Sequence, residues 1–151
     1  MRSLRPDCAL AVGQATGRGG VTPERTAVNL ADARIPDNDG AAPHGARLVP
    51  DGPEAYQSNL PVAGMAEAIL RAGLPASVSD SAGTFVCNAV LYALLHAIHT
   101  EFPGMGGGFI HVPCLPEQAK PGVPSMTAEA SAAALTAALA AAADALCVPE
   151  N

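Results

Sequence analysis

The sequence predicts an α/β protein, built as a three-layer α/β/α sandwich around a mostly parallel, twisted sheet. Short apolar runs typical of strands alternate along the chain with longer segments of helical periodicity. A chain of 151 residues with 49% hydrophobic residues is long enough to bury one core. We therefore expect a single domain over residues 1–151.

Strands and turns dominate the predicted N-terminal third. The apolar run 8–12 predicts a buried strand, and residues 25–30 predict a second one. Between them, residues 16–20 are glycine-rich but lack the spacing of phosphate-binding loops. Residues 31–53 are rich in turn-forming residues, so only 47–49 could form a strand there.

A first helix is predicted to begin at Pro61 and to stop at Gly73. Proline suits the first helical position, Asn59 is a candidate N-cap, and glycine commonly follows a helix end. We expect its apolar stripe to face the core: Val62, Met65, Ile69 and Leu70.

A strand and a second helix are predicted next. Residues 74–79 predict a central strand, and a helix follows from about Thr84, the candidate N-cap, to about Thr100. Its apolar residues recur at helical spacing: Val86, Val90, Leu91, Leu94, Leu95 and Ile98.

The C-terminal part predicts one more strand and a final helix. Residues 102–108 form a flexible glycine-rich loop, and residues 109–113 form a short strand. Residues 127–147 predict an alanine-rich helix of high intrinsic propensity. We expect its leucines to form the core face: Leu135, Leu139 and Leu146.

Charge and hydropathy exclude several classes of partner. The net charge of −6 and the pI near 5.0 argue against nucleic acid and against an anionic membrane surface. No apolar run approaches the length of a membrane span, and the apolar segment after Arg2 and Arg5 is too short for a signal peptide. We expect a cytoplasmic protein.

The cysteine pattern favours reduced thiols. Cys8, Cys87, Cys114 and Cys147 lie far apart, without the spacing of a zinc site or of a disulfide-stapled scaffold. We expect no structural zinc site.

Cys87 is a candidate nucleophile because it falls in the first turn of a helix that follows a strand. Unpaired backbone N–H groups and the positive end of the helix dipole favour a thiolate there. The alternative is a small core residue, since free cysteines are among the most buried side chains.

A nucleophilic cysteine needs a base, and His111 is the best placed histidine. His96 and His99 lie too far along the helix from Cys87, and His44 lies in a turn-rich loop. His111 lies in or at the end of a strand, where catalytic groups of α/β sheets commonly sit. A strand histidine bonded to the backbone is the alternative, and spacing alone selects no carboxylate as third member.

Four segments carry a resemblance to a known family. They are 81–88 (SAGTFVCN), 108–113 (GFIHVP) with 115–118 (LPEQ), 23–38 (PERTAVNLADARIPDN) and 13–18 (GQATGR). They resemble the active-site segments of the pyroglutamyl peptidase I (pyrrolidone-carboxylate peptidase) family of cysteine peptidases. The resemblance runs from about residue 6 to the final helix.

The resemblance implies a phosphorylase/hydrolase-like α/β/α fold and removal of N-terminal pyroglutamate from peptides. Cys87 would attack as thiolate, His111 would act as base and then acid, and Glu24 would orient the imidazole. Arg34 would support the oxyanion or the triad. Four residues would line the lactam pocket: Gln14, Ile35, Phe85 and Val86. No metal or cofactor is implied, and family members often assemble as homo-oligomers.

This chain departs from the family pattern at its start. Family members carry a further N-terminal strand and helix, so we expect the domain to be N-terminally truncated and its substrate pocket to be incomplete. The alternative to a peptidase is a non-catalytic remnant that acts at most as a binding or assembly partner. A nucleoside-phosphorylase-like enzyme is a distant third, because no phosphate or ribose ligands are evident.

Overall fold

The computed structural model describes residues 3–147 and places a mixed sheet at the centre. The strands β1 (Cys8–Gln14) and β5 (Gly106–Val112) run parallel and pair along their full lengths. On the other edge of β5 lies β2 (Thr22–Pro23), which is antiparallel. A separate antiparallel pair consists of β3 (Thr26–Val28) and β4 (Ala55–Gln57).

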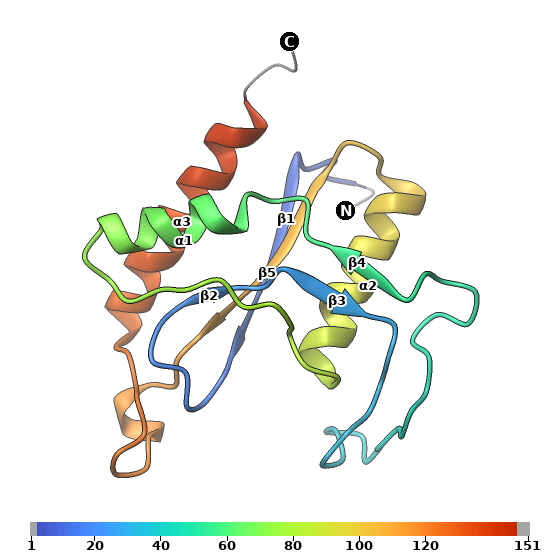
Figure 1. The fold of residues 1–151 in the computed structure, drawn as a ribbon, viewed down its shortest axis with the longest axis horizontal. Helices are drawn as coiled ribbons and strands as arrows, with labels where there is room; N and C mark the ends of the chain where they lie inside the picture. The colour runs from blue at the N-terminus through green and yellow to red at the C-terminus, as the bar shows by residue number, and fades with distance from the viewer. Residues whose placement is uncertain (1–2, 148–151) are drawn as a thin grey trace.

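Helices cover both faces of this sheet, which confirms the predicted α/β class (Figure 1). α2 (Val86–Glu101) packs on one side, and α1 (Val62–Arg71) and α3 (Ala128–Leu146) pack together on the other. Because strand side chains alternate, Ile110 of β5 joins the core of α1 and α3, while its neighbour Phe109 joins the core of α2. A short 3-10 turn, η1 (Pro116–Gln118), precedes α3.

The strand β5 begins earlier than predicted, because the glycines expected in a flexible loop are part of it. Gly106, Gly107 and Gly108 are all buried. A Cβ on Gly107 would collide with the Ile98 side chain, and one on Gly108 would lie 2.8 Å from Leu60 Cδ1. Because glycine has no side chain, α2 and Leu60 can approach the strand backbone closely.

Two other strand predictions are wrong. Residues 74–79 form only isolated parallel bridges, Val21 with Ala76 and Glu24 with Ser79, so they run beside β2 without becoming a strand. Residues 47–49 form no strand either, because β3 takes its partner from β4.

Helix α1 starts one residue later than predicted. Pro61 is its N-cap residue and no side chain caps it. Asn59 instead donates to the carbonyl of Met105 and accepts from the N–H of Gly107, so its side chain anchors the start of β5. In the predicted stripe, Met65 and Ile69 are buried, whereas Leu70 is exposed.

The core face of α3 consists mainly of alanines rather than leucines. Ala134, Ala138 and Ala142 are fully buried, whereas Leu139 and Leu146 are exposed, which corrects the sequence prediction. Small side chains let α3 approach α1 closely. Leu135 is half-buried and packs against the same core, as predicted.

Helix α3 is as long and apolar as a membrane-spanning helix, which the sequence prediction did not expect. Within residues 3–147 it is the one helix long and apolar enough to cross a bilayer, with 19 residues and a mean hydropathy of 1.3. One such helix is weak evidence for a membrane protein, and the buried alanines make α3 part of the packed domain.

Candidate active site

Cys87 is the second residue of α2, at the helix end that faces the carboxyl ends of β1 and β5 (Figure 1). Gly83 has a φ of 84° and turns the chain into the helix. The N-cap residue is Phe85, whose side chain makes no cap hydrogen bond, and the predicted cap Thr84 donates instead to the carbonyl of Asp32. The first N–H groups of α2 are therefore left without a side-chain cap.

Asn88 holds this end of α2 in place. Its buried carboxamide accepts from the N–H of Val28 and donates to the carbonyls of Val28 and Leu30. The helix that carries Cys87 is thus tied by two hydrogen bonds to Val28 of β3 and by one to Leu30, just after this strand. Sequence reasoning missed this residue, although a buried amide in the apolar pattern of the helix is a signal of such an anchor.

The structure brings Cys87 beside His111. The Cys87 Sγ lies 3.3 Å from the point that a Cβ on Gly13 would occupy, and Gly13 pairs with His111 across β1 and β5. Phe109 fills the adjacent space, with its ring centroid 4.8 Å from that of His111. Only a residue without a side chain fits at position 13, because a Cβ there would lie 2.7 Å from Phe109 Cζ.

His111 and Glu24 form a buried pair. The Nδ1 of His111 lies 2.6 Å from Oε1 of Glu24, and the two side chains are 5% and 0% exposed. Glu24 is held there by its backbone, because its N–H donates to the carbonyl of Phe109 on β5. An ionised carboxylate can only accept, so Nδ1 carries the proton and Nε2 is left free to act as a base.

A third charged residue, Arg18, joins this pair. Its Nη1 lies 2.7 Å from the same Oε1 of Glu24 and also donates to the hydroxyl of Thr22. Sequence analysis placed Arg18 in a glycine-rich loop and in the 13–18 segment that resembles the family, but assigned it no role.

Burial and neighbouring charges oppose each other in setting the pKa values of the site. Burial raises the pKa of Glu24, but hydrogen bonds with His111 and Ser79 and the charges of Arg18 and His111 bring it below its ordinary value. Burial also raises the pKa of Cys87, as does the carboxylate of Glu24, while Arg18 and the Cys87 backbone N–H lower it. The net effect is a raised pKa, because burial and Glu24 outweigh the lowering by Arg18 and by the backbone N–H at the helix start.

Three of the four predicted lactam-pocket residues line one hollow of about 340 Å³. Ile35, Phe85 and Val86 form its apolar part, and residues 36–39 complete it. The loop that carries Ile35 is fixed to the start of α2, because the N–H of Asp32 donates to the carbonyl of Thr84 over 2.8 Å.

Gln14 and Arg34 lie outside that hollow. Gln14 is exposed at the end of β1, and its amide donates to the hydroxyl of Thr16 over 3.4 Å. Arg34 is also exposed, two residues after the Asp32 contact with Thr84. Both side chains thus lie next to the site without being packed into its core.

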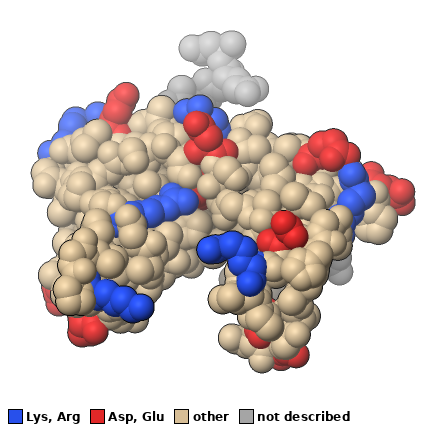
Figure 2. Space-filling view, turned by 60° about the horizontal axis from the view of Figure 1, so that its bottom comes forward, with Lys and Arg blue, Asp and Glu red and all other residues tan. Residues whose placement is uncertain are grey.

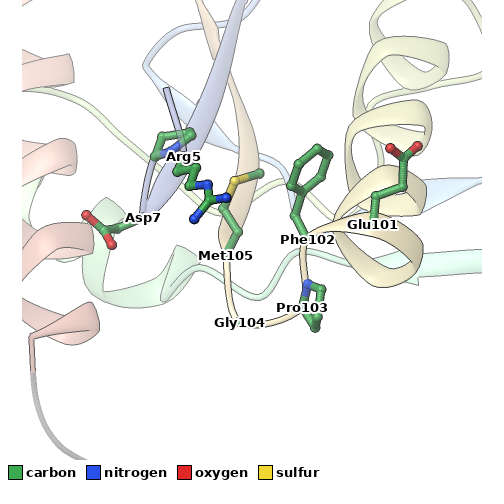
Figure 3. A pocket seen from close by; sticks show the side chains of 8 residues that line it. Arg5, Asp7, Glu101, Phe102, Pro103, Gly104 and Met105 are labelled. Carbon is green, nitrogen blue, oxygen red and sulfur yellow. The ribbon is translucent and has the colours of Figure 1, made fainter. Parts of the chain in front are cut away.

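The face that carries the carboxyl ends of β1 and β5 is hollowed between two lobes, with basic side chains on both sides (Figure 2). A larger hollow of about 580 Å³ lies at the other end of these strands, lined by Arg5, Asp7, Phe102 and Met105 among others (Figure 3). Asp7 and Met105 precede β1 and β5, so that hollow is remote from Cys87 and His111.

The thiols are as the cysteine spacing predicts. All four cysteines are free. Among residues 3–147, no group of three or more His, Cys, Asp and Glu side chains could hold a metal ion.

Comparison with known proteins identifies relatives along nearly the whole chain. The model of the pyroglutamyl peptidase family matches residues 1–145. A pyrrolidone-carboxylate peptidase of Levilactobacillus brevis is 53% identical over 137 residues, which are 89% of this chain and 67% of the relative. One of Streptomyces coelicolor is 54% identical over 144 residues, which are 95% of this chain and 67% of the relative.

Solved structures agree with this result. The crystal structure of pyroglutamyl peptidase I from Bacillus amyloliquefaciens superposes with a TM-score of 0.92 at 45% identity, covering 95% of this chain and 70% of that one. Pyrrolidone carboxyl peptidase from Thermococcus litoralis gives a TM-score of 0.92 at 38% identity, with 96% and 69% covered. The chain thus spans about two thirds of the length of these relatives.

Proposed function

The chain belongs to the pyroglutamyl peptidase family, and we propose that it removes N-terminal pyroglutamate from peptides with Cys87 as nucleophile, His111 as general base and Glu24 as the residue that orients His111. The observation that supports this proposal best is the buried His111–Glu24 pair, whose Nδ1 and Oε1 atoms lie 2.6 Å apart. His111 pairs across the sheet with Gly13, and the thiol of Cys87 lies next to Gly13.

In the first half of the reaction, Nε2 of His111 takes the proton of Cys87. The thiolate then forms a bond to the carbonyl carbon of the pyroglutamyl residue, whose oxygen becomes an oxyanion. The imidazolium gives its proton to the amine of the next residue as the C–N bond breaks. The peptide leaves as a free amine and the pyroglutamyl group remains on Cys87 as a thioester.

In the second half, water replaces the peptide. His111 takes a proton from the water as the water oxygen attacks the thioester carbonyl. The C–S bond then breaks, and the Cys87 sulfur leaves and recovers a proton from His111. Because the thiol pKa is raised in the resting site, the proton transfer to His111 is what makes the nucleophile available. Glu24 keeps Nδ1 protonated throughout, so Nε2 alone changes state.

The start of α2 is the proposed oxyanion site. Its first N–H groups have no side-chain cap and point toward the region of the Cys87 thiol. Arg34, exposed on the loop fixed to Thr84, would add positive charge there. The hollow lined by Ile35, Phe85 and Val86 would take the lactam ring, and Gln14 would approach it from β1.

Hydrolysis of a fluorogenic pyroglutamyl amide by the purified chain tests this proposal, with the matching prolyl amide as a substrate that lacks the lactam carbonyl. We expect turnover of the pyroglutamyl amide only, and none in Cys87→Ser. Turnover that survives Cys87→Ser would contradict the assignment of the nucleophile. A folded chain without turnover would favour the non-catalytic alternative.

A further inference from the structure

Arg18 reaches the catalytic pair from a loop that the proposed mechanism does not use. Its Nη1 contacts Oε1 of Glu24 at 2.7 Å, the same oxygen that His111 approaches at 2.6 Å. The same guanidinium donates to the hydroxyl of Thr22, and Thr22 is the register partner of His111 on β2. Arg18 and His111 thus share one carboxylate oxygen, and Thr22 holds the guanidinium of Arg18.

The carboxylate of Glu24 needs such a cation. Its side chain is 0% exposed, so water does not solvate the carboxylate. A buried carboxylate is strongly destabilised unless a charged partner and hydrogen bonds compensate for the lost water. His111 supplies a positive charge only while it is protonated, whereas an arginine is always charged.

We propose that Arg18 is a fourth, positioning residue of the site, which keeps Glu24 ionised and cancels its charge at the thiol while His111 gains and loses its proton. This inference rests on the proposed function, because it assigns a role to Arg18 in that reaction. Arg18 touches Glu24 rather than the substrate, so it acts through the triad.

The charges around Cys87 agree with this role. The carboxylate of Glu24 raises the pKa of Cys87 and the guanidinium of Arg18 lowers it. The thiol lies against Gly13, the register partner of His111 on β5, and the backbone N–H of Cys87 comes from its own helix. On the segment before α2, Asp80 is paired with Arg25 over 2.9 Å and both are largely exposed, so water screens their charges. Without Arg18, the thiol would face an uncompensated carboxylate.

Alkylation of Cys87 tests the proposal without any need for peptidase turnover. Iodoacetamide reacts with the thiolate, so its rate at Cys87, mapped by mass spectrometry from pH 5 to pH 10, reports how much thiolate is present. We expect Arg18→Gln to move this profile to higher pH and to slow alkylation about tenfold at pH 7. Arg18→Lys keeps the charge, so its profile should lie close to that of the unchanged chain.

Arg71→Gln is the matched control, because Arg71 is 70% exposed and pairs with Glu67 on the surface of α1. Its alkylation profile should not move. An Arg18→Gln profile that coincides with that of Arg71→Gln would overturn the proposal. So would an Arg18→Lys profile displaced as far as that of Arg18→Gln, because the shape of the guanidinium and not its charge would then matter.

A second measurement covers the case in which Arg18→Gln fails to fold. The double variant Arg18→Gln with Glu24→Gln contains no unpaired buried charge, so we expect it to unfold at a higher temperature than Arg18→Gln alone. Equal or lower stability of the double variant would contradict charge compensation. A chain that hydrolyses no pyroglutamyl amide but shows these shifts would refute the proposed function while still supporting the compensation of the Glu24 charge by Arg18.

Discussion

Helices α2 and α3 differ at their first residues: α3 has a side-chain cap, which stabilises the helix, whereas α2, which carries Cys87, has none. α3 starts behind Thr127, whose hydroxyl accepts from the N–H of Ala130 over 3.2 Å. α2 starts behind Phe85, whose side chain caps nothing, and Cys87 lies in its first turn. A capped helix end is satisfied by its own chain, whereas an uncapped one remains available to a substrate.

The two helices are also held to the domain by different forces. α3 packs through Ala134, Ala138 and Ala142, which are fully buried against the core of α1. The start of α2 is instead tied by the three hydrogen bonds of Asn88 to the backbone of Val28 and Leu30. Directional bonds place a nucleophile more narrowly than apolar contacts do, since they constrain angles as well as distances.

Asn88→Ala should produce the largest loss of stability of the three changes that test this comparison. It removes all three hydrogen bonds and leaves buried backbone groups of β3 without partners, so we expect a loss of about 3 kcal/mol in the free energy of unfolding. Urea denaturation measures it, and alkylation of Cys87 should slow as well. A variant as stable as the unchanged chain would show that the anchor of α2 is not Asn88.

Acidification should weaken the α2 end through Glu24. The pKa of Glu24 is lowered in the folded chain, so the unfolded chain binds its proton first as the pH falls. Stability should therefore be fully present near neutral pH and be lost from about pH 5 downward, through the folded pKa. Thermal unfolding against pH measures this loss, which should be smaller in Glu24→Gln.

The matched control for this change is Glu54→Gln. Glu54 is 85% exposed and pairs with Arg47 at the surface, so its removal should leave the acid dependence of stability unchanged. Equal pH dependence in Glu24→Gln and Glu54→Gln would contradict a specific contribution of the buried carboxylate.

Thr127→Ala should have the smallest effect. It removes the side-chain cap of α3 and should cost about 1 kcal/mol of stability. Because α3 contributes no residue to the site, the alkylation profile of Cys87 should stay in place. Denaturant unfolding and the alkylation rate measure both expectations, and a displaced profile would mean that the two helices are coupled.

Several features of the site could be predicted because they depend on local sequence. The turn at Gly83 and the helical spacing after it predict that Cys87 lies in the first turn of α2, and the structure confirms this position. The apolar run around His111 predicts its strand. The family resemblance, rather than spacing, singled out Glu24, and the structure places it against His111.

Other features could not be predicted because they depend on contacts between distant segments. Nothing near Arg18 shows that it lies against Glu24, since the contact arises only when β2 pairs with β5. Leu139 and Leu146 of α3 were expected in the core because hydrophobicity ranks leucine above alanine, yet both are exposed. The close packing of α3 on α1 reverses that order, because only small side chains fit between the two helices.

The sequence by itself determined the α/β class, the position of Cys87 at a helix start and the free state of the thiols, because periodicity, glycine punctuation and cysteine spacing act over a few residues. Tertiary structure alone decided where β5 begins, which face of α3 is buried and which charges surround the thiol. These outcomes depend on how closely backbones approach and on which oppositely charged groups share one buried space, and both follow from the packing of the whole chain.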